Sequence, residues 1–188
     1  MLGTRKERLR AALNDSDEGV RFAAADALER LESALALDQV IAVLAGDNRG
    51  QRVRAVYALE RINSSQVFPP LLTALADKDE DLRAAAVQVL GRKQNPKTLP
   101  QLVRHLRDPH PAVRVHTAEA LGKFGDRRLV PYLAKLLTAQ DEELVKSALR
   151  AIGMIGAPEG EAVLFAMLED SRPAIRREAA RALGQLEI

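Results

Sequence analysis

The chain repeats one pattern at a constant offset of 31 residues, with no insertion or deletion between the copies. The clearest copy is DPHPAVRVHTAEALGKFG at 108–125. Anchored on the arginine of that copy, the pattern recurs at Arg21, Arg52, Arg83, Arg114, Val145 and Arg176. A fixed period of this length is typical of a solenoid, in which each unit stacks on its neighbours. We therefore expect one continuous repeat domain over 1–188, with repeats at roughly 1–31, 32–62, 63–93, 94–124, 125–155 and 156–188.

Each repeat carries the pattern of two amphipathic helices joined by a short turn. The first helix has an unbroken leucine column: Leu13, Leu44, Leu75, Leu106, Leu137 and Leu168. The second helix has apolar or small residues on one face, as at Val113, Thr117, Ala120, Leu121 and Phe124. The turn is rich in Asp, Asn, Gly and Pro, which cap or start the following helix. One helix pair cannot bury these faces alone, so the pattern predicts an all-α solenoid of six stacked pairs.

The composition limits both the chemistry and the location of the protein. The chain has no cysteine, and therefore neither disulfides nor thiolate chemistry. Its formal net charge of +2 is too small by itself to favour nucleic acid or membranes. The chain has no apolar run of about 18 residues, and its N-terminus lacks the apolar stretch of a signal peptide. We expect a cytoplasmic protein without membrane contact.

The segment DPHPAVRVHTAEALGKFGDRRLVPYLAKLL resembles the short HEAT-like repeat, the type also found in phycobilisome lyase-like proteins. SRPAIRREAARALGQL and DLRAAAVQVLG carry the same core. The resemblance implies a right-handed α-solenoid whose first helices line the convex side. It implies that the second helices line the concave side, where partners dock. It also leaves open a bilin lyase-like subunit that holds a tetrapyrrole.

The residues that commonly carry catalysis do not form a recognisable site. The three histidines, His105, His110 and His116, lack the i, i+4 spacing of a helical metal site. The chain has no His-Glu pair, which the related HEAT-repeat hydroxylases use, and no G-x-S-x-G motif. Paired carboxylates lie at expected helix starts, where capping accounts for them. We therefore predict a non-enzymatic protein without a metal or cofactor.

Two sets of basic residues allow a nucleic-acid interpretation. The arginine column lies near the turn aspartates, which favours a structural Arg–Asp ladder over a phosphate-binding stripe. The segment 91–130 carries nine basic residues against three acidic ones. A solvated surface is the simpler interpretation of that segment, because aromatic residues are few. Binding of a nucleic-acid backbone through 91–130 stays open as a less favoured alternative.

The expected partner-binding residues are those on the second helices that the core does not need. Their columns vary in chemistry from repeat to repeat while the core columns do not. We expect Phe22, Val53 and Tyr57 to fall together as an apolar and aromatic patch, with Val115 as a further anchor. The expected polar rim is Arg54, His116, Glu119 and Arg150. The sequence thus predicts a scaffold or adaptor that binds another protein on its concave face.

Overall fold

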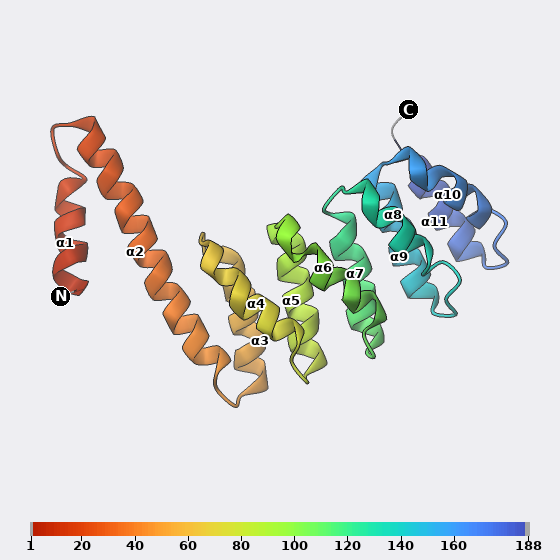
Figure 1. Cartoon of the computed structure of the whole chain (residues 1–188), viewed down its shortest axis with the longest axis horizontal. Coiled ribbons are helices and arrows are strands. Elements are labelled where there is room, and N and C mark those ends of the chain that lie inside the picture. The colour runs from red at the N-terminus through yellow and green to blue at the C-terminus, as the bar shows by residue number, and fades with distance from the viewer. Residues whose placement is uncertain (1, 187–188) are drawn as a thin grey trace. The chain divides into compact units, whose positions relative to one another are not determined.

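The computed structural model describes residues 2–186, which form helices and turns without a β-strand (Figure 1). The all-helical solenoid architecture expected from the repeat is confirmed. The chain divides into two compact units, 1–70 and 71–188, and each is described by itself. A single continuous domain of six repeats stays a prediction.

Unit 1 contains three α-helices: α1 (Leu2–Ala12), α2 (Glu18–Leu44) and α3 (Arg49–Ala58), followed by the 3₁₀ turns η1 (Leu59–Arg61) and η2 (Ser65–Val67). α1 and α3 both pack on α2. Asp17 and Asn48 cap α2 and α3, each accepting a hydrogen bond from a backbone N–H of the first turn. Arg52 donates to the carbonyl of Leu44 and Asn63 donates to Glu29. Therefore α3 and its continuation lie along the 29–44 part of α2.

α2 is unbroken where the sequence predicted a boundary between the repeats 1–31 and 32–62. At the equivalent position of later repeats, Gln94, Gly125 and Gly156 adopt left-handed backbone angles, with φ of 48°, 62° and 71°. That conformation ends a helix, and it is unfavourable for Glu32, which instead stays helical. Six residues later the chain has Asp38, where the next three repeats have proline. With neither a glycine nor a proline to stop it, the helix continues for 27 residues.

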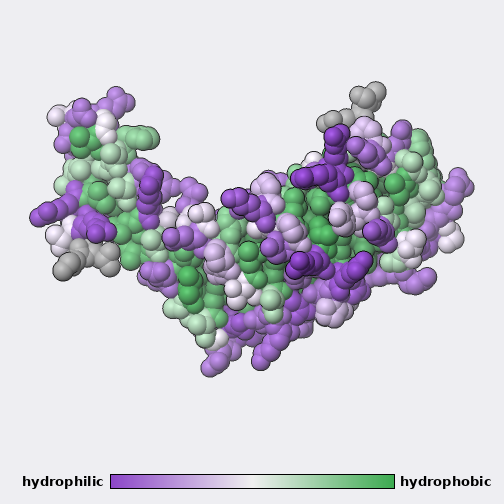
Figure 2. Space-filling view, in the orientation of Figure 1, coloured by the Kyte–Doolittle hydropathy of each residue, from purple (hydrophilic) through white to green (hydrophobic). Residues whose placement is uncertain are grey.

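The unbroken helix leaves apolar side chains of unit 1 in contact with solvent. Only Ala24 and Leu37 of α2 are buried. Val20 and Phe22 near its start are exposed, as are Ile41 and Val43 near its end. Figure 2 accordingly shows hydrophobic atoms at the surface over α1 and α2.

α4 (Phe68–Leu75) spans the boundary between the units. Unit 2 has two layers of helices. Its second helices are α5 (Glu80–Lys93), α7 (Pro111–Gly122), α9 (Glu142–Ile155) and α11 (Pro173–Leu183). Its first helices are α6 (Leu99–Arg104), α8 (Val130–Ala134) and α10 (Glu161–Met167). Each follows directly on a 3₁₀ turn, in the same order η3 (Pro96–Thr98), η5 (Arg127–Leu129) and η6 (Pro158–Gly160). A further 3₁₀ turn, η4 (His105–Arg107), follows α6. Successive second helices stack on one another, and each first helix packs on the second helix of its own repeat. The leucines between the layers, including Leu102, Leu133 and Leu164, are fully buried.

Glycine permits close contact between neighbouring second helices. A Cβ added at Gly122 would lie 2.7 Å from the Cα of Ala151. Gly91 meets Ala120 in the same way one repeat earlier. The small residues expected at these positions therefore set a short and well-defined spacing between helices.

The arginine column is structural, although its main acceptors differ from those expected. The Nη1 of Arg114 donates to the carbonyl oxygens of Asp108 and Pro109, at 2.9 and 3.1 Å. Arg21, Arg83 and Arg176 make the same two bonds to their own turns. Thus each arginine ties its helix to the preceding turn, mostly through backbone carbonyls.

Arg83 also binds a carboxylate in two places. Its Nε and Nη2 lie 2.8 and 2.9 Å from the carboxylate oxygens of Asp108, in the next repeat. Burial raises the pKa of Asp108, but the hydrogen bonds from Arg83 and from the His110 N–H outweigh it, so the pKa lies below its ordinary value. This pair links two repeats of unit 2.

Candidate partner-binding face

A chain of ion pairs joins α7 and α9 on the second-helix layer of unit 2. Arg150 of α9 lies 3.7 Å from Glu119 of α7 and 3.0 Å from Glu143. Glu143 also pairs with Lys146 at 2.7 Å, and His116 Nδ1 lies 3.3 Å from Glu119. We call these five residues the second-helix ion cluster. It brings together three of the predicted site residues, His116, Glu119 and Arg150.

Each ionisable group with a shifted pKa in this cluster is held in its charged form. The pKa of Glu119 is lowered mainly by the hydrogen bond with His116, against the effect of burial. The pKa of Glu143 is lowered by hydrogen bonds from Lys146 and Arg150, and that of Lys146 is raised by Glu143. A carboxyl group that acts as a general acid needs a raised pKa, and neither carboxylate of the cluster has one. The cluster therefore has the properties of a polar recognition surface.

Two apolar side chains lie on the same pair of helices. The predicted anchor Val115 is half-buried on α7. Met154 of α9 is 51% exposed, and the sequence analysis did not identify it. The signal was present, because Met154 interrupts a column that is basic in the first four repeats: Arg30, Arg61, Arg92 and Lys123. An exposed methionine beside charged groups suits an adaptable protein contact.

The predicted residues of unit 1 lie on two helices, α2 and α3. Phe22 is 78% exposed and lies about two helical turns N-terminal of Glu29, which accepts a hydrogen bond from Asn63. Val53 and Tyr57 are half-buried on α3. The grouping of these three residues as one contact patch therefore stays a prediction.

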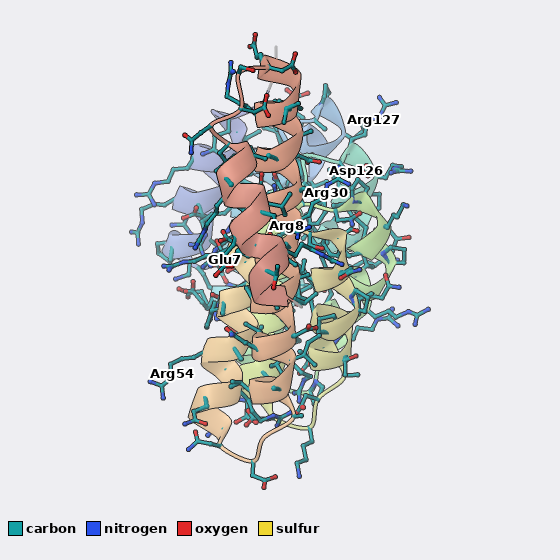
Figure 3. All side chains as sticks on the ribbon, turned by 90° about the vertical axis from the view of Figure 1, so that its left-hand side faces the viewer. Glu7, Arg8, Arg30, Arg54, Asp126 and Arg127 are labelled. Carbon is teal, nitrogen blue, oxygen red and sulfur yellow. The ribbon has the colours of Figure 1, made fainter. Side chains whose placement is uncertain are left out.

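Arg54 lines a groove of unit 1. The groove has a volume of about 420 Å³ and runs between α2 and α3, lined also by Val40, Val43 and Ala55. Arg54 projects away from the ribbon in Figure 3, and its Nε donates to the carbonyl of Gly50 at 3.2 Å. In the same column as Val40, the later repeats have leucines that are completely buried, whereas Val40 is half-buried. The groove therefore exposes apolar surface that the later repeats cover.

Residues 2–186 contain neither a metal-ligating cluster nor a helix that could span a membrane. Within that range, no group of three or more His, Asp or Glu side chains is placed to hold a metal ion. None of the described helices is long and apolar enough to cross a bilayer.

Family models match most of the chain. The model for HEAT repeats matches residues 68–151 and 133–187, and the model for the PBS lyase HEAT-like repeat matches 51–77. A search of curated protein sequences found no significant match.

Solved structures of repeat proteins superpose on the chain. A chain from the complex of CpcE and CpcF of phycocyanin lyase from Nostoc sp. PCC7120 is 29% identical, with a TM-score of 0.67 over 80% of this chain and 64% of that one. This chain thus spans less than two thirds of the lyase chain. YIBA of Escherichia coli is 24% identical, with a TM-score of 0.65 over 97% and 72%. A designed armadillo repeat protein, solved with the peptide (KR)4, is 19% identical with a TM-score of 0.60 over 99% of both chains.

The 31-residue period, the stacked helix pairs of unit 2 and the matched models agree with one another. The last two structural neighbours support the fold alone, because they are less than 25% identical. The HEAT-repeat model covers well over half of the residues. The chain belongs to the HEAT-repeat family.

Proposed function

We propose that the chain is a non-enzymatic scaffold that binds another protein through the second-helix layer. The observation that carries this proposal is the second-helix ion cluster, which spans the joint between α7 and α9 and is only partly buried. Its two carboxylates and two permanent cations balance one another. A surface of mixed sign favours a protein partner with complementary charges over a polyanion such as nucleic acid.

Rigidity supports the same proposal. The glycine contacts between second helices leave no room for the helices to shift toward each other, as the 2.7 Å approach at Gly122 illustrates. Side chains on α7 and α9 are therefore presented in a fixed arrangement before the partner arrives. Such preorganisation lowers the entropic cost of binding.

A photo-crosslinking experiment in cells tests this face. Benzoylphenylalanine at Met154, beside the ion cluster, should crosslink a defined protein. The same group at Phe165, which is 54% exposed on the first helix α10, is the matched control. Adding Arg150→Glu, which reverses the charge at the centre of the cluster, should abolish the crosslink at 154. Equal crosslinking at 154 and 165, or a crosslink that survives the charge reversal, contradicts the proposal.

A second candidate function is a bilin lyase-like subunit, which the 29% identity to a chain of phycocyanin lyase favours. That chain was solved in a complex of two different proteins, CpcE and CpcF. Under this proposal the present chain holds a tetrapyrrole together with a partner chain. Titration with biliverdin should then shift and sharpen its long-wavelength absorbance band. An unchanged absorbance spectrum argues for the scaffold. The predicted cytoplasmic location is the same for both candidate functions.

A further inference from the structure

A groove crosses the first-helix layer of unit 2, on helices other than those that carry the ion cluster. It has a volume of about 510 Å³ and lies between α6 with η4 and α8. Val103, Leu106 and Leu136 line it with aliphatic carbon, and Tyr132 stands at its edge, 46% exposed. Figure 2 shows hydrophobic atoms bordered by strongly hydrophilic ones over the region where Figure 1 places α6 and α8.

Three cations surround this groove: Arg104, Arg107 and Lys135. All three are exposed, and neither arginine has an acidic partner within residues 2–186. The Lys135 ammonium lies 5.7 Å from the centre of the Tyr132 ring. These groups are therefore available to bind an anion from outside the chain.

The repeat framework does not require cations at these positions. Arg104 and Lys135 occupy one column in consecutive repeats, and the other four members of that column are uncharged: Ala11, Ala42, Thr73 and Ala166. The positive charge is thus specific to one joint of the array. Two other basic residues of the 91–130 segment have acidic partners within the chain, since Arg128 pairs with Asp126 at 2.6 Å and Arg127 with Glu159 at 3.5 Å (Asp126 and Arg127 are labelled in Figure 3).

A second hollow of about 520 Å³ adjoins the first and shares Val103 and Tyr132 with it. Its other apolar lining includes Leu99, Pro100 and Leu129. The second hollow is also lined by the ion pair of Asp126 and Arg128, so the cations without an acidic partner lie at the first hollow. We call the two hollows, with Arg104, Arg107 and Lys135, the first-helix groove.

We propose that the first-helix groove binds an acidic peptide segment of a partner protein. Apolar side chains of the peptide fill the two hollows, and its carboxylates meet Arg104, Arg107 and Lys135. An apolar floor with a charged rim is the usual composition of a peptide-binding site. A nucleic-acid backbone would satisfy the cations but leave the aliphatic floor unfilled, and Tyr132 is the groove's single aromatic side chain for stacking. This site lies outside the face proposed above and carries a different chemistry.

Fluorescence anisotropy on the full chain tests the proposal with three labelled probes of equal length. These are a peptide of alternating Glu and Leu, a peptide of Glu and Ser, and a single-stranded oligonucleotide. We expect the Glu/Leu peptide to bind, and the Glu/Ser peptide to bind about tenfold more weakly because it cannot fill the hollows. Binding should weaken as the ionic strength rises.

Variants locate the site. The double substitution Arg104→Glu with Arg107→Glu should weaken binding of the Glu/Leu peptide by about a hundredfold, and Tyr132→Ala by about tenfold. Lys123→Glu with Arg177→Glu makes the same change in net charge at exposed positions outside the groove and should leave the affinity within about twofold. Because the substituted side chains are exposed, the circular dichroism spectrum and melting temperature should stay those of the parent chain.

Three results would overturn the proposal. The first is failure of the Glu/Leu peptide to bind at low ionic strength. The second is equal weakening by the control pair and by the groove pair, which would mean attraction by net charge alone. The third is tighter binding of the oligonucleotide, lost on charge reversal at Arg104 and Arg107, which would assign the groove to nucleic acid.

Discussion

The pair of Arg83 and Asp108 should contribute much more to stability than Arg114 contributes. Their side chains are 12% and 4% exposed, and the guanidinium meets the carboxylate through two hydrogen bonds of 2.8 and 2.9 Å. The substitution Arg83→Ala would leave Asp108 with one N–H donor, from His110. A buried carboxylate that loses its cation is strongly destabilising.

The magnitude follows from comparison with Arg114. Both arginines donate to two turn carbonyls, but the carboxylate nearest Arg114, that of Asp141, lies 4.0 Å away and is 33% exposed. Losing the carbonyl bonds alone should cost about 1 kcal/mol in Arg114→Ala. Removing the partner of a buried carboxylate costs about 3–5 kcal/mol, so Arg83→Ala should cost about 3 kcal/mol or more. Arg114→Ala is the matched control.

Urea unfolding followed by circular dichroism at 222 nm measures both costs, because urea does not screen charges. The pKa of Asp108 is lowered in the folded protein, below its ordinary value of 3.8. The contribution of the ionised carboxylate is therefore fully present above about pH 4, and it is lost as the pH falls through the lowered folded pKa. The difference between the two variants should be constant from pH 7 to pH 5 and should shrink as the pH falls further. Equal costs at pH 7, or a difference that does not change in acid, would refute the reasoning.

Two further substitutions test the packing of the helices. Asp38→Pro should cost about 3 kcal/mol or more, because it places proline inside the unbroken α2, whereas Asp38→Ala should be nearly neutral; a harmless Asp38→Pro would show that the helix is broken there, as in the later repeats. Gly122→Ala should cost about 1–3 kcal/mol in urea unfolding, because its Cβ would lie 2.9 Å from that of Ala151. Gly184→Ala, whose Cβ would have no neighbour closer than 3.5 Å, should be neutral or slightly stabilising, and equal losses at both glycines would contradict the close-contact explanation.

The candidate surfaces were only partly predictable from the sequence. The columns of variable residues on the second helices identified Glu119 and Arg150, and a constant 31-residue offset necessarily places them on adjacent helices. These two side chains lie 3.7 Å apart in the structure, and their role in binding a partner stays a prediction. Met154 lies in a column that is basic in the first four repeats, so the pattern did not predict an apolar contact there. The first-helix groove was missed because the second helices alone were assigned to partners.

The sequence by itself determined the helical class, the period and the residues of the core, because each depends on local spacing and on a repeat that recurs without insertion. The tertiary structure decided where that regularity ends. Whether the helix stops between Glu32 and Asp38 depends on the helix propensity of these residues and on how the helix packs against its neighbours. A pattern of apolar residues gives no information about that balance. The same holds for charges. Basic residues outnumber acidic ones by nine to three in the segment 91–130, yet in the folded chain Arg127 pairs with Glu159 and Arg128 with Asp126, whereas Arg104 and Arg107 lie at an apolar groove. Pairing depends on distances between neighbouring repeats, and those distances exist only in the folded chain.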